Sequence, residues 1–147
     1  MACRRCWRLT FHRVQLATHS VNEAELAAGL PTTAQYRYAQ RVGPQLFVAG
    51  QVPHDATGRL VGAGDPYVQA SRCLANLGTV VAVHGFSITD IRQLVVYVVG
   101  EQPHLSMAWK AVAEFFGGQV PPATLLGVAR LGYSEQLVEV DATVLKA

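Results

Sequence analysis

From residue 36 onward, short apolar segments alternate with two longer amphipathic ones. The segments YRYAQR (36–41) and QLFVAGQV (45–52) predict two strands, and the VGP between them (42–44) supplies turn residues, so the pair predicts a hairpin. IRQLVVYVVG (91–100) is almost continuously apolar and predicts a strand buried on both faces. Two further strands are predicted at 123–131 and 137–145, separated by a turn at GYSE.

Two helices are predicted between these strands. Asp65 followed by Pro66 marks a helix start, because the carboxylate can cap free N–H groups and the proline ring presets φ at the first helical position. This helix runs to about His84 and ends at Gly85. A second helix spans roughly 103–116 and ends at a Gly-Gly pair. Its apolar stripe contains Leu105, Trp109, Val112 and Phe116.

The predicted element order is ββαβαββ, which is an α/β (α+β) fold with one mixed sheet. Strand–helix–strand crossovers are right-handed in nearly all proteins, so both helices are expected on the same face of the sheet. The segment 94–99 is apolar on both faces, yet the helices cover only one of them. We therefore expect the open face to be covered by self-association.

Length and composition favour one domain preceded by an irregular segment. Residues 1–30 show no sustained periodicity and are expected to form an N-terminal extension, which leaves 31–147 as the domain. Its first twenty residues are Arg-rich and acid-poor, as in transit peptides, although a disordered extension or an early start codon is the preferred interpretation. No apolar run approaches the roughly 20 residues of a membrane span, so we expect a soluble protein without a membrane partner.

Charge and cysteine usage narrow the function classes. The formal net charge is +2, but four of the twelve basic residues lie in 1–22 and no acid precedes Glu23, so the remainder carries eight basic and ten acidic residues. A body with a net charge of −2 lacks the basic face that nucleic acid binding requires.

Three cysteines make an odd count, which favours a reducing cytoplasm over a disulfide framework. The CRRC pair (3–6) cannot complete a tetrahedral zinc site, and no metal or cofactor is expected.

Several stretches match one family in both sequence and spacing. They are VGPQLFVAGQVPHDATGRLVG, QASRCLANLGTVVAVHGFSITDIRQLVVYV, AEFFGG and PPATLLGVARL followed by LVEVDATVL, and they lie within residues 36–146. Together they resemble the Rid family, also known as the YjgF family. The resemblance implies a chorismate-mutase-like fold and a homotrimer with a central barrel and ligand clefts between subunits. It also implies hydrolysis of the reactive enamines and imines made by pyridoxal-phosphate enzymes, which releases a 2-oxo acid and ammonia.

The resemblance implies site residues, some of which depart from the family pattern. Tyr36, the backbone of Gly50 and the acid Glu139 match, with Glu139 in the catalytic role. The arginine that grips the substrate carboxylate in active deaminases falls at Ala123, or at Thr124 if one gap is allowed. An arginine suits that role because its fork binds a carboxylate bidentately.

Two further family positions also differ. An asparagine of the family enzymes falls at Trp109, and a serine falls at Ala49. If another residue anchors the carboxylate, Arg37 and Arg130 are the first candidates. Several of the site residues also have a purely structural interpretation. In that interpretation Trp109 is a core residue, Tyr36 is a packing residue, and Thr124 bonds to the backbone near the Pro-Pro break. Glu139 and Asp141 then form the solvated face of a strand.

Three functions remain open at this point. The first is a homotrimer that binds a small metabolite between subunits, with imine hydrolysis lacking its usual arginine. The second is a non-catalytic sensor or scaffold that uses the same cleft. The third is RNA cleavage, which the net charge disfavours.

Overall fold

The computed structural model describes residues 21–147, so the CRRC pair and the arginine-rich start lie outside the described residues. No helix within the described part of the chain is both long and apolar enough to cross a membrane. The elements are α1 (Glu23–Ala27), β1 (Ala39–Val42), β2 (Gln45–Gln51), α2 (Pro66–Val83), a short 3-10 helix (Ile88–Asp90), β3 (Ile91–Val99), α3 (Gln102–Phe115), β4 (Ala123–Val128) and β5 (Val138–Leu145).

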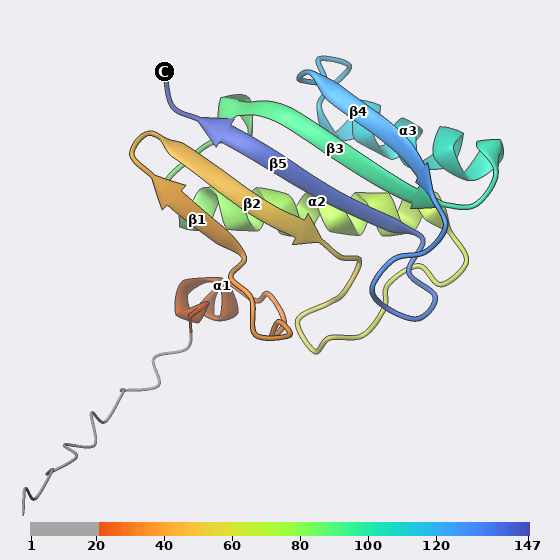
Figure 1. Ribbon diagram of the computed structural model, residues 1–147, viewed down its shortest axis with the longest axis horizontal. Coiled ribbons are helices and arrows are strands. Elements are labelled where there is room, and N and C mark those ends of the chain that lie inside the picture. Colours follow the sequence, from red (N-terminus) through yellow and green to blue (C-terminus); the bar gives the residue numbers. More distant parts are fainter. Residues whose placement is uncertain (1–20) are drawn as a thin grey trace, which may run out of the picture.

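The five strands form one mixed sheet in the order β1-β2-β5-β3-β4. β3 and β4 run parallel, whereas β1–β2, β2–β5 and β5–β3 are antiparallel. Helices α2 and α3 lie together behind the sheet in Figure 1 and leave its other face open. The predicted mixed α+β fold, with both long helices on one face, is therefore confirmed.

Helix α2 begins and ends where the local sequence predicts. The Asp65 carboxylate accepts hydrogen bonds from the N–H groups of Tyr67 (2.9 Å) and Val68 (3.1 Å), and Pro66 takes the first helical position. At the other end, Gly85 adopts a positive φ of 76°, a conformation that glycine tolerates best. One face of the helix is fully buried, at Cys73, Leu74, Leu77, Val80 and Val81.

The two faces of the sheet differ in their burial. Alternate strand residues face the helices and are buried, namely Leu46, Val48, Leu94, Val96, Val98, Val138, Val140, Ala142 and Val144. The opposite face keeps large apolar side chains in solvent: Phe47 is 47% exposed and Leu126 is 42% exposed. On this open face Tyr97 donates a hydrogen bond to Asp141 at 2.8 Å, so Asp141 has a partner on the neighbouring strand.

The N-terminal boundary differs from the expected one. Part of the expected irregular extension, residues 21–30, contains α1, and its residues Asn22, Glu25 and Leu30 are each only 4% exposed. A helix of five residues is too short to show a period, so the pattern of apolar positions does not reveal it. The structured domain therefore begins before residue 31.

Two strands are shorter than predicted. The first starts at Ala39 rather than at 36, because the Asn22 side chain, instead of a neighbouring strand, binds the Tyr38 N–H and the Tyr36 carbonyl. The strand predicted at 123–131 ends at Val128. It lies at the edge of the sheet, and its pairing with β3 stops at that residue.

Candidate functional site

A pocket of about 600 Å³ opens beside the carboxyl end of β2 and the start of β5. Three of the residues predicted from the sequence, Tyr36, Gly50 and Glu139, line it together. The remaining lining residues are Ala34, Arg37, Ala49, Val52, Gly132 and Tyr133. Segments that are far apart in the sequence thus meet at this pocket.

Gly50 leaves room for the carboxylate of Glu139. The register between β2 and β5 shifts between Val48 and Gln51, which places Gly50 in an irregular part of the strand. A Cβ atom built on Gly50 would overlap with the side chain of Glu139, including Oε1. The family resemblance implies a role for the Gly50 backbone, and the structure adds a steric reason for glycine at this position.

Gln136 holds the other oxygen of the same carboxylate. Its Nε2 donates hydrogen bonds to Glu139 Oε2 (3.0 Å) and to the Val138 carbonyl (3.2 Å). Its Oε1 accepts from the Tyr133 N–H at 3.1 Å. Gln136 is 3% exposed, so this amide orients the carboxylate from within the protein. Sequence reasoning missed Gln136; the signal was a polar residue directly before an apolar strand.

Tyr36 is held in its protonated form. Burial raises the pKa of the Tyr36 phenol, and the neighbouring Tyr133, Tyr38 and Glu139 raise it further. At neutral pH the hydroxyl is therefore a hydrogen-bond donor as well as an acceptor.

His54 forms part of the surroundings of the pocket through its contact with Tyr133. The two rings meet edge to face, with centroids 4.7 Å apart. Burial lowers the pKa of His54, although the nearby Asp55 opposes the shift. The imidazole is consequently uncharged at neutral pH and supports the Tyr133 ring. The sequence offered no spacing that would link these two residues.

The other residues predicted from the sequence do not line this pocket. Trp109 is half-buried on α3 and packs against the core. Ala123 and Thr124 are exposed at the start of β4, where they pair with Leu94 and Val95 of β3. Because β5 and β3 lie between β2 and β4, these residues are near the opposite edge of the sheet from Gly50. Within one chain, the predicted anion-binding position and Glu139 belong to different regions.

A second pocket, of about 450 Å³, lies beside the start of β4. Its walls are mainly apolar, formed by Ile88, Ile91, Phe115, Phe116, Pro121 and Pro122, with Thr89, Arg92 and Gln119 as polar members. Arg92 already donates a hydrogen bond to the Thr89 carbonyl at 3.0 Å. No carboxylate lines this pocket, so it lacks the general base that the proposed type of hydrolysis needs.

Metal-binding and thiol chemistry find little support in the described part of the chain. Among residues 21–147, no group of three or more His, Cys, Asp or Glu side chains could hold a metal ion. Cys73 is fully buried. Burial raises the pKa of its thiol well above the usual value, and the nearby Glu139 adds to the shift. A neutral, inaccessible thiol is a poor nucleophile.

Known proteins resemble this chain over most of its length. The family model described as Endoribonuclease L-PSP matches residues 27–146. A RutC family protein of Pyrococcus horikoshii is 32% identical over 112 residues, which are 76% of this chain and 86% of that protein.

Solved structures share the fold. A candidate endoribonuclease of Thermotoga maritima is 28% identical, with a TM-score of 0.74 over 82% of this chain and 94% of that one. The YjgF gene product of Escherichia coli is 22% identical, with a TM-score of 0.73 over 82% of this chain and 95% of that one. The chain therefore belongs to the endoribonuclease L-PSP family, which is the Rid or YjgF family that its sequence motifs resemble.

Proposed function

We propose that this protein binds a small metabolite in the pocket of Tyr36, Gly50 and Glu139 and hydrolyses reactive enamines or imines there. The observation that carries the proposal is that a carboxylate and a protonated phenol line the same pocket. In the proposed reaction one water adds across the C=N bond of a 2-imino acid. The C–N bond then breaks, and a 2-oxo acid and ammonia are released.

Each of the two polar side chains has a role in this reaction. Glu139 holds the water and accepts its proton while the oxygen attacks the imine carbon. The hydrogen bond from Gln136 to Oε2 leaves Oε1 as the oxygen that binds the water. Negative charge develops on the substrate nitrogen as the C=N bond opens. Tyr36 donates a hydrogen bond to this nitrogen and stabilises the charge. Glu139 returns the proton of the water to the nitrogen, which gives a carbinolamine. It then takes the proton of the new hydroxyl group and passes it to the nitrogen while the C–N bond breaks, so that ammonia leaves and the C=O bond of the 2-oxo acid forms.

The charge of the ligand depends on what replaces the expected arginine. The resemblance assigns the carboxylate anchor to Ala123 or Thr124, and neither residue carries a cation. Arg37 lines the pocket, and its side chain has no hydrogen bond or ion pair among the described residues. Arg130, the other candidate, does not line the pocket. Arg37 is therefore the proposed anchor for an anionic ligand.

Assembly into a homotrimer is part of the proposal. The open face of the sheet exposes Val42, Phe47, Leu126 and Leu145. Exposed apolar side chains gathered on one face are typical of a protein interface. A trimer that packs these faces around a central barrel would cover them and would bring β4 of one subunit toward a neighbouring subunit.

RNA cleavage, to which the name of the matching family model refers, has weaker physical support. Residues 21–147 carry eight basic and ten acidic side chains, so this part of the chain has no excess of positive charge for a phosphate backbone. Its candidate site also contains Glu139, whose negative charge opposes phosphate binding.

An assay of imine turnover tests the proposal. Freshly generated 2-aminocrotonate is mixed with the wild-type protein, and release of 2-oxobutyrate and ammonia is compared with spontaneous hydrolysis. A Tyr36→Phe, Glu139→Gln double variant should lose the acceleration. A Glu114→Gln variant should keep it, because this carboxylate lies on α3 outside the pocket. Absence of turnover in a protein that still binds small ligands would favour the non-catalytic sensor or scaffold instead.

A further inference from the structure

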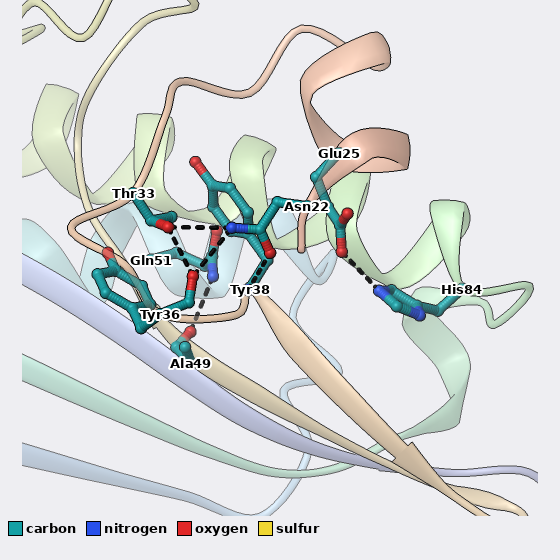
Figure 2. Close-up of polar contacts among 8 residues, drawn as sticks. All are labelled: Asn22, Glu25, Thr33, Tyr36, Tyr38, Ala49, Gln51 and His84. Atoms are coloured by element: carbon teal, nitrogen blue, oxygen red, sulfur yellow. Dashed lines mark hydrogen bonds and ion pairs between the residues drawn. The ribbon is translucent and has the colours of Figure 1, made fainter. Parts of the chain in front are cut away.

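We infer that Asn22 and α1 form a clamp that positions Tyr36 for its role in the pocket. Asn22 is only 4% exposed, although it stands before the match to the family model begins. Its Nδ2 donates to the Tyr36 carbonyl at 2.9 Å and to Thr33 Oγ1 at 3.0 Å, and its Oδ1 accepts from the Tyr38 N–H at 3.0 Å. Figure 2 shows these bonds running from Asn22 to Thr33, to the Tyr36 carbonyl and to Tyr38. The role of Tyr36 itself rests on the proposed function.

The backbone leading into Tyr36 needs this support. Gln35 has a φ of 65°, in the left-handed region that residues other than glycine rarely adopt. Such a conformation persists only where the surrounding structure holds it. Here the Tyr36 carbonyl is fixed by two donors, Asn22 Nδ2 and Thr33 Oγ1, the latter at 2.6 Å. The backbone of Tyr36 is therefore held by groups outside the pocket.

The clamp is itself attached firmly to the domain. Glu25 of α1 is 4% exposed and pairs with His84, directly after α2, at 2.7 Å between Oε1 and Nε2. Closer to the pocket, the Tyr38 hydroxyl donates to the Pro31 carbonyl at 2.7 Å. The Glu25–His84 pair joins the start of the segment 22–38 to the end of α2, and the Tyr38–Pro31 bond closes a loop within the segment. Asn22 is thus held in place as well as holding Tyr36.

This arrangement makes Asn22 a positioning residue and not a catalytic one. It does not line the pocket, and its side chain acts on the backbone of Tyr36. A hydrogen bond to a reacting group supports catalysis only where its geometry is held closely, so the ordering of Tyr36 must be achieved before the substrate binds. Loss of Asn22 should consequently affect turnover more than substrate binding.

Kinetics of Asn22→Ala test the clamp through its coupling to Tyr36. With freshly generated 2-aminocrotonate, we expect kcat to fall roughly tenfold to a hundredfold while KM changes less than about threefold. In a Tyr36→Phe background the same substitution should lower kcat less than about twofold, because it acts through the missing hydroxyl. Equal effects in both backgrounds would overturn the inference.

A spectroscopic arm works whether or not the protein turns over imines. The ring resonances of Tyr36 in ¹³C-tyrosine-labelled protein are assigned by their loss in Tyr36→Phe. We expect Asn22→Ala to shift and broaden them, whereas Val80→Ala, a fully buried change on α2, should leave them in place. Thr33→Val keeps Asn22 but removes the Thr33 Oγ1 donor, so a smaller shift is expected if Asn22→Ala does not fold. An unchanged Tyr36 resonance in Asn22→Ala or in Thr33→Val contradicts the clamp. Lack of imine turnover in the wild type contradicts only the proposed function.

Discussion

The carboxylate of Glu139 occupies the space that a side chain at Gly50 would need, so a strand irregularity in β2 and an acid of β5 fit together as one unit. A single methyl group at residue 50 would force the carboxylate to move. The clash involves the mobile end of the Glu139 side chain, and the protein can relieve it without shifting a strand.

Gly50→Ala should therefore remove activity without unfolding the protein. We expect imine turnover to fall to the level of Glu139→Gln, with a melting temperature within about 5 °C of the wild type, which corresponds to roughly 1 kcal/mol for a domain of this size. Turnover assays and thermal denaturation of the two variants provide the measurement. Wild-type turnover in Gly50→Ala would show that the position of the carboxylate does not matter.

Replacement of Arg37 tests which residue anchors an anionic ligand. Arg37→Gln should weaken binding of benzoate by roughly tenfold, equivalent to about 1.4 kcal/mol, because a charge-assisted contact is lost at an exposed position. Neutral benzamide should bind both proteins equally. Arg130→Gln serves as the matched control, since Arg130 does not line the pocket. Titration calorimetry that finds the two arginine variants indistinguishable would leave the pocket without an anion anchor and favour neutral ligands.

The open face of the sheet predicts the oligomeric state. Sedimentation at micromolar concentration should show a trimer for the wild-type protein. Leu126→Asp should shift the protein toward monomers, because it places a charge among the apolar side chains that the proposed interface buries. Met107→Asp provides a control, since Met107 is similarly exposed but lies on α3, away from the open face. A wild-type monomer would contradict the proposed assembly.

Two N-terminal truncations should differ in stability. Removal of residues 1–30 deletes Asn22 with its three hydrogen bonds, the Glu25–His84 pair and the buried side chain of Leu30. The combined loss should be at least about 3 kcal/mol, which corresponds to roughly 10 °C in melting temperature. Removal of residues 1–20 serves as the reference, and calorimetry measures the difference. Equal melting temperatures would show that residues 21–30 do not contribute to stability.

Stability at alkaline pH should depend on Tyr38. Burial raises the pKa of Tyr38 from 10.0 to about 12, with further contributions from Tyr133 and Glu25. Because the folded state holds this proton more tightly than the unfolded state, the protonated phenol increases the free energy of unfolding. This increase is complete below pH 10 and is lost as the pH rises through about 12. Urea denaturation of the wild type between pH 8 and 12 should show this loss. Tyr38→Phe should show a smaller decline over the same range; an identical decline would assign the effect to other groups.

Local signals in the sequence were sufficient for much of the fold. The Asp65 cap, the Pro66 start and the glycine after α2 depend on neighbouring residues alone, so their sequence pattern predicts them directly. The apolar strands and the shared face of α2 and α3 follow from periodicity and crossover handedness. The part that was missed, α1, is held by contacts with residues 11 to 59 positions away.

The candidate site was predicted less completely, because its contacts are non-local. Resemblance to a family pointed to Tyr36, Gly50 and Glu139, and the structure brings these three together. No periodicity or spacing could show that Asn22 holds Tyr36, since this contact depends on how two separate segments meet. The bond from Gln136 to Glu139 spans only three residues, but a polar residue before a strand does not show which group its side chain binds. Trp109 was ambiguous for a similar reason: an apolar helical stripe does not show whether a ring faces the core or a cleft.

The position of β5 has a consequence for synthesis of the protein. This last strand lies between β2 and β3, so until it leaves the ribosome the sheet consists of two unconnected pairs, β1–β2 and β3–β4. The residues that later face the helices from β5 are absent during this time, and the edges of β2 and β3 are unpaired. The nascent chain therefore cannot complete its core before β5 (Val138–Leu145) has emerged, and cooperative folding must wait for this strand. A premature stop just before Val138 would leave a chain with two exposed strand edges, prone to aggregation and a target for proteolysis.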